Sequence, residues 1–568
     1  MVQSRLTRKL KCPVQAEPIH LRIGVNMKKT WLLLTLLPYL ISYPSAPAIT
    51  ADRAFTELVF IDHINLRYVE GVEQAKEEVE HAKRNIDKAA QYGVHSYLLF
   101  AKESMEAILT YDFEVPGIGT IGRNAFPSGG KHRRTAEYMR QALNDVIEHA
   151  RSRSVRLFFH SNQFIFPEEV LDVIRPATWG TAVCPGREAT WAVYRGKIEE
   201  FFRLFPDIAG LQITGDETQV SVLQCKCEKC RDMTFVERVN RLTNETAAVA
   251  RKYGKEVQMR TWQRMGELGD PSNMEQGILD NVFFSIKNTD GDFRLPHGLD
   301  EKFLTAAVPG RVICEFDAWR EYEGHNYFPC YMGNDWASRF RFLHDKGIER
   351  IAVRLMWNSN KNPIFERPWA NNVNLYAFLR LSENPRLDGQ EVLHMFVREH
   401  YPEGSWQAAM DVYNFSQSFQ RTIYYINGEV YNANHSRVQD DHAVEDLQDS
   451  QDDLRFLSNR EDFDKRRDEI ETTYSKAMDL VGQLGSDVSP EWIQGLRDGA
   501  RVERYVALSN IDKMEMFFLL QRRQTGEDVR DAIAELKKHM EERIKEWKEW
   551  DLGSYDDMEG KAIMEDWE

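Results

Sequence analysis

The stretch Ile286–Phe293, which reads Ile-Lys-Asn-Thr-Asp-Gly-Asp-Phe, decides the fold expected for this chain. It places a lysine and two carboxylates at and just beyond the end of an apolar run that is typical of a β-strand. The pair Asp216-Glu217 follows another such run, Ile208–Ile213, and Glu321 follows a third. Acidic side chains at the C-terminal ends of successive strands are the arrangement in which a β/α barrel holds its reactive groups.

Apolar, β-branched or aromatic runs recur along the chain, and segments with helical periodicity lie between most of them. Strands that alternate with helices predict a parallel sheet with right-handed crossovers, and eight such strands predict a closed (β/α)8 barrel over residues 52–385. The short run Gly180–Cys184 is interpreted as a loop. The eight predicted strands are Leu58–Ile64, His95–Phe100, Val155–His160, Leu211–Thr214, Val257–Trp262, Val282–Lys287, Val312–Phe316 and Ile351–Trp357.

After about Pro385 the strand-like runs largely stop, and long charged segments with helical spacing take their place. They predict an all-helical C-terminal domain over residues 386–568. We expect its amphipathic segment Ile493–Leu520 either to pack on the barrel or to support a homodimer. The segments that carry this prediction are Asp462–Leu484, Pro490–Arg522 and Gly526–Trp550.

The N-terminal region carries the features of an export signal. A basic stretch at 27–29, an apolar run at 31–43 and a small-x-small motif at 46–48 predict a signal peptide over residues 27–48. The apolar run is too short to span a bilayer comfortably, so no membrane span is expected after cleavage. Residues 1–26 do not belong in front of such a signal, and we interpret them as a doubtful extension. The signal has bacterial character, which predicts a periplasmic or secreted protein.

The composition limits the partners. The chain has 568 residues and a formal net charge of −16, with an isoelectric point near 5.5. This balance argues against a nucleic-acid partner, because a surface that binds phosphates is basic. The 13 tryptophans and 21 tyrosines are compatible with stacking on sugars, although aromatic side chains also fill large cores.

A cysteine motif follows the acidic pair. Cys225, Cys227 and Cys230 lie in the loop after Glu217. They could supply three thiolates to a zinc ion with one ligand from elsewhere. In an oxidising compartment one of them could instead form a disulfide with a neighbour such as Cys184. Both alternatives predict a structural role for this loop, and neither implies a catalytic metal or another cofactor.

The predicted strand ends together carry the functional groups that cleavage of a glycosidic bond requires. That reaction needs one carboxylic acid to protonate the leaving oxygen and one carboxylate to activate water or to attack the anomeric carbon. Two cations at the same strand ends indicate a substrate that is itself anionic. The candidate residues are Asp216, Glu217, Arg260, Trp262, Lys287, Asp292, Glu321 and Trp357.

The segment from about Thr178 to Pro385 resembles the α-glucuronidases of glycoside hydrolase family 67. The resemblance rests on ordered motifs that cover roughly two fifths of the chain. These motifs are Pro206–Gly210, Ile286–Phe293, Glu315-Phe316 with Glu321-Tyr322-x-Gly324, Cys330-Tyr331-x-Gly333 with Trp336, and Asn374–Pro385.

The resemblance implies an inverting hydrolase that removes a terminal uronic acid of the glucuronic type from polysaccharide-derived oligosaccharides. By position, Glu217 would be the general acid, with Asp216 beside it as an alternative, and Asp292 and Glu321 would activate the hydrolytic water. Arg260 and Lys287 would bind the uronic acid carboxylate, and Trp262 and Trp357 would contribute to the sugar site.

The chain departs from the family pattern, which makes it a distant relative. Thr214 stands nearest to the position where the family has a further lysine, and the spacing to Glu217 is one residue shorter. The motif Cys225-x-Cys227-x-x-Cys230 is not part of the family pattern. Two alternatives therefore stay open: a glycosidase of the same barrel type that acts on a different sugar, and a glycan-binding protein without catalytic activity.

Overall fold

The computed structural model describes residues 53–64, 72–101, 104–163, 165–178, 183–214, 225–260, 275–356, 363–426, 429–430, 457 and 459–549. The predicted extension 1–26 and signal peptide 27–48 lie outside these ranges. In the described part of the chain, no helix combines the length and the apolar character needed to cross a membrane.

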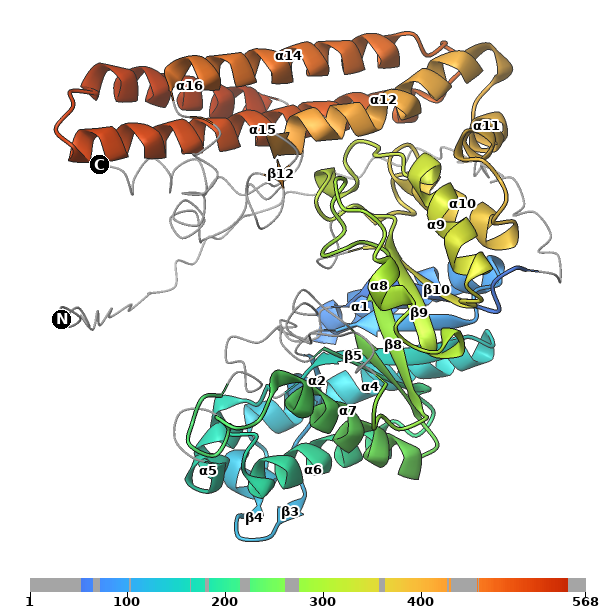
Figure 1. Ribbon diagram of the computed structural model, residues 1–568, viewed down its shortest axis with the longest axis vertical. Helices are drawn as coiled ribbons and strands as arrows, with labels where there is room; N and C mark the ends of the chain where they lie inside the picture. Colours follow the sequence, from blue (N-terminus) through green and yellow to red (C-terminus); the bar gives the residue numbers. More distant parts are fainter. Residues whose placement is uncertain are drawn as a thin grey trace, which may run out of the picture. The chain divides into compact units, whose positions relative to one another are not determined.

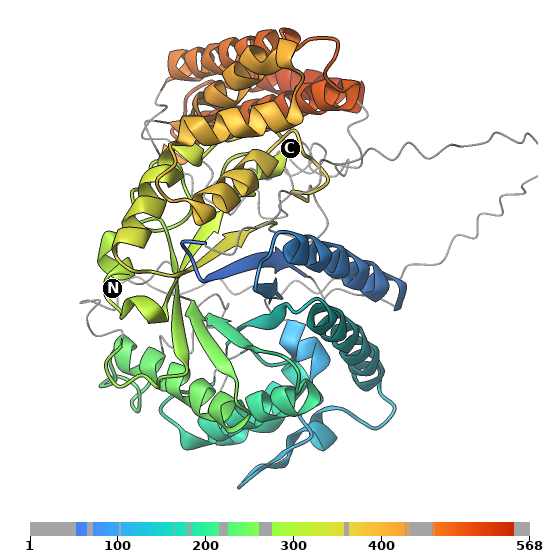
Figure 2. The same cartoon turned by 90° about the vertical axis from the view of Figure 1, so that its right-hand side faces the viewer.

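Eight parallel strands close into a barrel, in the order β1-β10-β9-β8-β7-β6-β5-β2 (Figures 1 and 2). All eight predicted strands are confirmed, with ends that differ from the predicted ones by three residues at most. The eighth ends earlier than predicted, at Arg354, and the fifth is described as far as Arg260. The strands are β1 (Glu57–His63), β2 (Ser96–Phe100), β5 (Arg156–Asn162), β6 (Gly210–Thr214), β7 (Glu256–Arg260), β8 (Val282–Lys287), β9 (Val312–Asp317) and β10 (Arg350–Arg354).

Side chains alternate between the two faces of each strand, as the pleat requires. One set packs outward against the helices in the main hydrophobic core, for example Leu58 and Phe60 of β1. The other set points into the barrel. Part of it forms a separate inner apolar cluster, which contains Val59, Ile61 and Phe158. On β6 to β10 many of the inward positions are polar or charged.

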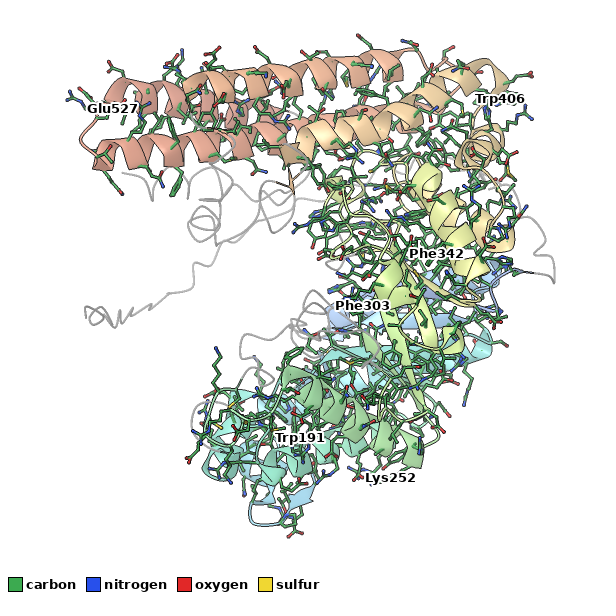
Figure 3. The ribbon with its side chains drawn as sticks, viewed as in Figure 1. Trp191, Lys252, Phe303, Phe342, Trp406 and Glu527 are labelled. Carbon is green, nitrogen blue, oxygen red and sulfur yellow. The ribbon has the colours of Figure 1, made fainter. Side chains whose placement is uncertain are left out.

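Helices of the barrel lie on the outer side of the strands (Figure 2). Side chains fill the space between the two layers, and Trp191 of α6 is fully buried there (Figure 3). Helix α7 begins with a capping box in which Thr234 and Glu237 exchange hydrogen bonds, which satisfies its first free amides. The larger barrel helices are α1 (Val72–Gln91), α4 (Lys131–Ser152), α5 (Glu168–Thr178), α6 (Glu188–Leu204), α7 (Phe235–Lys252), α9 (Gly333–Asp345) and α10 (Asn372–Glu383).

Smaller elements connect this framework. They are the short helices α2 (Ser104–Ile108), α3 (Ile121–Ala125) and α8 (Glu301–Leu304), the two-stranded pair β3 (Glu114–Val115) and β4 (Gly119–Thr120), and the 3-10 turns η4 (Pro309–Arg311), η5 (Gly324–Asn326) and η6 (Glu403–Ser405). Of the segment interpreted as a loop at 180–184, residues 183 and 184 are described and form no strand.

The C-terminal region is helical, as predicted. Helix α14 packs against α12 and α15, and α16 packs against α15 (Figure 1). Only a two-stranded pair, β11 (Tyr425–Ile426) and β12 (Glu429–Val430), was not expected. The predicted segment Ile493–Leu520 lies within α15, and a homodimer through these helices stays a prediction. The helices are α11 (Gly389–His400), α12 (Trp406–Tyr424), α14 (Arg460–Gly482), α15 (Pro490–Gln524) and α16 (Arg530–Glu549).

Candidate active site

Four of the eight predicted site residues fall within the described residues. Arg260 is the last residue of β7, Lys287 is the last residue of β8, Asp292 follows β8, and Glu321 follows β9. All four are buried at the C-terminal ends of neighbouring strands. The other four, Asp216, Glu217, Trp262 and Trp357, lie outside the described residues.

Strand register brings oppositely charged inward residues together. Lys287 of β8 is paired in register with Glu315 of β9, and Asp317 of β9 is paired with Arg354 of β10. Each of these side chains is buried. With the loop residues that follow the strands, they form what we call the ion-pair cluster. Its members are Arg260, Lys287, Asp292, Glu315, Asp317, Glu321 and Arg354.

The first pair of the cluster joins Arg260 to Glu315. The Arg260 Nε–H donates to Glu315 Oε1 and Oε2 at 3.1 and 3.0 Å, and the Ser285 hydroxyl donates to Oε1. Burial alone would raise the pKa of Glu315, but Arg260 and the Ser285 hydroxyl hold that pKa below its ordinary value. Among the described residues, Nη1 of Arg260 is buried without a hydrogen-bond partner. The guanidinium thus has a donor left for a further acceptor.

The second pair joins Lys287 to Asp292. Lys287 Nζ contacts Asp292 Oδ1, and the Tyr322 hydroxyl donates to Oδ2. Burial works to raise the pKa of Asp292, but Lys287 and the Tyr322 hydrogen bond lower it well below its ordinary value. Asp292 is therefore ionised at neutral pH. The turn that carries it needs Gly291, whose φ of 95° is unfavourable for residues with a Cβ.

The third pair joins Arg354 to Glu321, and the backbone of Glu321 is fixed as well. Arg354 Nη1 contacts Glu321 Oε2. Asp317 accepts from the amides of Arg320 and Glu321 at 3.1 and 2.8 Å. Arg320 has a φ of 64°, in the left-handed region that residues other than glycine rarely adopt. Strained backbone of this kind clusters at functional sites, because the surrounding structure must hold it in place.

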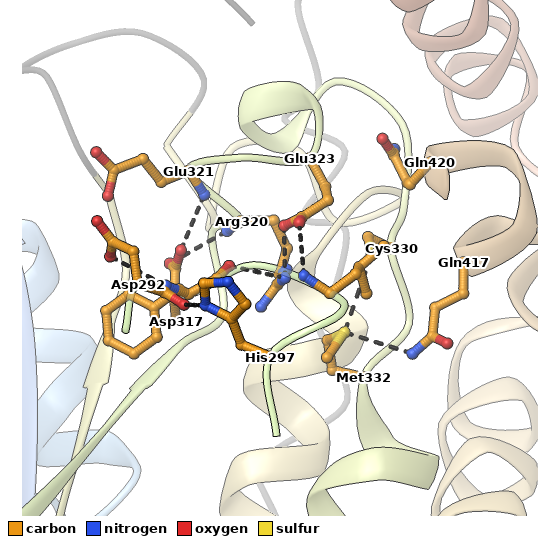
Figure 4. A network of polar contacts seen from close by, with 12 residues as sticks. Asp292, His297, Asp317, Arg320, Glu321, Glu323, Cys330, Met332, Gln417 and Gln420 are labelled. Atoms are coloured by element: carbon orange, nitrogen blue, oxygen red, sulfur yellow. Dashed lines mark hydrogen bonds and ion pairs between the residues drawn. The ribbon is translucent and has the colours of Figure 1, made fainter. Parts of the chain in front are cut away.

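The C-terminal helical region supports the loop after β9. Arg320 forms an ion pair with Glu323, which also accepts from the hydroxyl of Tyr425, the first residue of β11. The Phe328 amide donates to Glu503 of α15 at 2.8 Å. Figure 4 shows the Arg320–Glu323 ion pair of this network, with the Asp292 and Glu321 side chains on the same side of it. The helices of this region thus help to fix the position of a candidate catalytic loop.

Two buried asparagines at the start of α10 complete the support. Asn371 donates to the Trp319 carbonyl at 3.0 Å and accepts from the Cys330 amide at 2.8 Å. Asn374 accepts from the Met332 amide at 2.8 Å and donates to the Cys330 carbonyl at 2.9 Å. These bonds satisfy backbone groups of the loop between β9 and α9.

Sequence reasoning missed Arg354 and gave Glu315 no role in the site. Both occupy inward positions of short strands, two residues after an inward apolar residue, Ala352 or Ile313. The alternation along each strand therefore indicates that Glu315 and Arg354 point into the barrel. The predicted eighth strand extends to Trp357, whereas β10 ends at Arg354, which places Arg354 at the strand end.

The described residues that could hold a metal ion lie elsewhere on the same face of the barrel. Cys184, Cys225, Cys227 and Cys230 bring their sulfur atoms within 4.8 Å of one another. The three predicted cysteines are therefore brought together, and Cys184, named as a disulfide neighbour, is the fourth member. The sequence is compatible with either a zinc site or a disulfide at these cysteines.

The fold resembles solved structures of glycoside hydrolases. A GH138 enzyme targeting the pectin rhamnogalacturonan II has 10% identity and a TM-score of 0.54, over 88% of this chain and 76% of that one. CpGH84B has 11% identity and a TM-score of 0.41, over 88% and 74%. A GH20 exo-β-N-acetylglucosaminidase from Vibrio harveyi has 12% identity and a TM-score of 0.38, over 64% and 59%.

At these identities the likeness concerns the fold, and only the first of the three is similar enough to support an argument. No protein-family model matches the sequence, and no curated protein matches it significantly. Neither of these two comparisons shows a family for this chain, so membership of glycoside hydrolase family 67 stays a prediction.

Proposed function

We propose that this protein is a glycoside hydrolase whose active site lies at the C-terminal ends of β6 to β10. The observation that carries the proposal is the placement of Asp292 and Glu321. Both are buried carboxylates on adjacent loops, each held by a cation, at the end of the barrel where such folds keep their reactive groups. The barrel fold shared with a GH138 enzyme is consistent with it.

The roles follow from the chemistry of each group. Asp292 is ionised, which suits a residue that activates water or stabilises positive charge and excludes it as the general acid. Glu321, from the neighbouring loop, shares this task in our proposal. The acid must then come from another strand end, and Glu217 after β6 takes that role, with Asp216 as the alternative. The pairing of one acid with a water-activating carboxylate makes inversion the expected outcome.

We further propose that the substrate ends in a uronic acid of the glucuronic type. Arg260 supports this, because its Nη1 is a buried donor with no partner among the described residues. A buried unpaired guanidinium N–H is costly, and a carboxylate or hydroxyl of the substrate would satisfy it. Lys287 would act beside it, and Trp262 and Trp357 would contribute aromatic surface.

A second candidate, a glycosidase that acts on a neutral sugar, is favoured by a different observation. Each cation of the ion-pair cluster already faces a carboxylate of the chain, namely Glu315, Asp292 or Glu321. A substrate carboxylate would have to share these cations with groups that are already bound to them. A neutral sugar needs only hydrogen bonds and would leave the pairs intact.

A product assay separates the candidates. The purified protein is incubated with glucuronic-acid-bearing oligosaccharides, pectin fragments and neutral oligosaccharides, and the released sugars are identified by chromatography. We expect release of a uronic acid, and we expect Glu217→Gln to lower turnover by about 100-fold or more while binding persists. Glu403→Gln, at an exposed position of η6, is the matched control and keeps wild-type turnover.

Three outcomes would change the proposal. Release of a neutral sugar alone would show that the proposed uronic acid substrate is wrong, while the protein would still be a glycoside hydrolase. Binding to an oligosaccharide without any product would favour the non-catalytic alternative. Wild-type turnover in Glu217→Gln would remove that residue from the acid role and bring Asp216 forward. Export through the predicted signal peptide 27–48 also belongs to this proposal, and N-terminal sequencing of the protein from a periplasmic fraction tests it.

A further inference from the structure

Four cysteines from two separate segments converge near the N-terminal ends of α6 and α7. Cys184 lies just before α6, and Cys225, Cys227 and Cys230 lie just before α7. The Cys184 sulfur is 3.4 Å from the sulfur of Cys227 and 3.4 Å from that of Cys230. All four sulfur atoms lie within 4.8 Å of one another, and none of the four residues forms a disulfide.

These distances fit a shared metal ion. A tetrahedral zinc ion with four thiolates has Zn–S bonds of about 2.3 Å, which places the sulfur atoms roughly 3.8 Å apart. A disulfide would bring two sulfurs to about 2.05 Å and leave the other two without a reason to converge. Cys184 is equally near to two partners, so the geometry favours no particular pair. We propose that Cys184, Cys225, Cys227 and Cys230 bind one structural zinc ion.

The backbone around the sulfurs is built for ligands. The Gly186 amide donates a hydrogen bond to the Cys184 sulfur, and the Lys229 amide donates to the Cys227 sulfur. Amides that point at sulfur stabilise thiolates and orient them toward a metal. The two loops also approach too closely for a side chain at Gly186, because a Cβ there would lie 3.0 Å from the Cys230 sulfur and 2.9 Å from Lys229 Cβ.

Each loop is also tied to the helix that follows it. The Thr190 hydroxyl of α6 donates to the Cys184 carbonyl at 2.7 Å. The Trp191 indole of α6 donates to the Pro185 carbonyl, also at 2.7 Å. Arg238 of α7 donates to the Cys230 carbonyl. The zinc ion would therefore join the N-terminal ends of α6 and α7 at the face of the barrel where β6 ends.

This position has a consequence for catalysis, which rests on the proposed function. The loop from β6 to α7 carries Asp216 and Glu217, and Cys225 comes eight residues after Glu217 in the same loop. The zinc ion would fix the C-terminal end of that loop. Loss of zinc should therefore lower kcat in the product assay, while the zinc content itself is measured without reference to any activity.

The test begins with the wild-type full chain, which is expressed in zinc-supplemented medium and purified without chelators or nickel resin. Metal content is measured by inductively coupled plasma mass spectrometry, and the intact mass is measured under denaturing, non-reducing conditions. We expect one zinc per chain and a mass that corresponds to fully reduced cysteines. Replacement of zinc by Co²⁺ should give the thiolate-to-cobalt charge-transfer band and the intense visible bands of a tetrahedral sulfur site.

Variants then assign the ligands. Cys184→Ser should reduce the zinc content from one per chain to near zero after dialysis against a chelator. Cys314→Ser is the matched control, because Cys314 is a buried cysteine of β9 outside the site, and it should retain one zinc. The wild-type metal content and mass decide the question even where Cys184→Ser does not fold.

Several results would overturn the proposal. A metal-free wild type whose mass is lower by four hydrogens would indicate two disulfides instead. A metal-free wild type with reduced thiols would show that the four cysteines bind no metal ion. Iron instead of zinc in the purified protein would show that the site binds a different metal from the one proposed. Full zinc retention in Cys184→Ser would exclude Cys184 as a zinc ligand. An inactive but zinc-loaded protein would leave this site in place and count only against the proposed function.

Discussion

Removing the cation from the Arg260–Glu315 pair should destabilise the protein strongly and in a pH-dependent way. The two side chains are each 1% exposed and are joined by the Arg260 Nε–H at 3.0 to 3.1 Å. Arg260→Met keeps most of the aliphatic stem of the arginine and removes the charge. Glu315 is then left buried as a carboxylate that has lost its principal cation.

The magnitude follows from this loss. Breaking a buried pair by removing one partner costs about 3 to 5 kcal/mol, because the remaining charge is uncompensated. Glu315 keeps the Ser285 hydroxyl and the more distant charge of Arg354, which both favour its ionised form. We therefore expect the lower end of the range, about 3 kcal/mol at pH 7, which is roughly a hundredfold in the folding equilibrium.

The pH dependence gives the sharper test. In the wild type, the folded-state pKa of Glu315 is below its ordinary value, so the pair contributes stability above the unfolded pKa of about 4.3 and loses it as the pH falls. In Arg260→Met, burial prevails and raises the folded-state pKa above the unfolded value. The variant therefore loses stability as the pH rises. The difference between the two proteins should be small near pH 4.5 and largest near pH 7.

Urea unfolding at pH 5 and pH 7 measures the difference, with fluorescence and circular dichroism transitions required to coincide. Adding Glu315→Gln to Arg260→Met should restore most of the stability at pH 7, because no buried charge remains. Arg151→Met is the matched control, since its pair with Asp207 is 64% and 56% exposed and contributes little. The reasoning would be refuted if Arg260→Met lost no more free energy of unfolding than Arg151→Met, or if its loss did not change with pH.

Two further predictions concern the loop after β9. Asp317→Asn replaces one of the two oxygens that accept from the Arg320 and Glu321 amides by an NH2 donor. Because Glu321 would then be held less well, kcat in the product assay should fall by up to about 100-fold with KM little changed. An unchanged kcat would show that Asp317 does not position Glu321. Glu503 is buried, which raises its pKa well above the ordinary value, so its burial costs stability as the pH rises beyond about 4.3. Glu503→Gln should therefore flatten the decline of Tm between pH 5 and pH 8, whereas Glu403→Gln should leave that slope as it is.

The sequence predicted the framework well because the barrel repeats one simple pattern. Each strand is a short apolar run between helical segments, and strands of this kind are readable from local periodicity. The eight runs and the main C-terminal helices were located within a few residues. The placement of Arg260 and Lys287 at strand ends followed from the same pattern, because parallel strands of a barrel all end on one face.

The rest of the site depends on contacts between segments that are distant in sequence. Nothing near Glu321 in the sequence indicates that Arg354 pairs with it or that Glu503 of α15 accepts from its loop at Phe328. The asparagines of α10 act through the same kind of contact. Cys184 joined the later cysteine motif only because α6 and α7 are neighbours in the barrel. Such partners are fixed by tertiary packing, which a single sequence does not encode in local form.

The buried charges inside the barrel are themselves an argument for the proposed function. Buried ion pairs contribute little net stability, because desolvation offsets much of their attraction, and apolar residues of similar size would often serve the fold better. The apolar cluster with Val59, Ile61 and Phe158 shows that the interior of this barrel can be filled in that way. Yet the ion-pair cluster places its three buried cations and their carboxylates on β7 to β10 and in the loops that follow β8 and β9. Charges fixed in advance are what a reaction with developing charge requires. The proposed function gives these buried charges a role, whereas the stability of the fold does not.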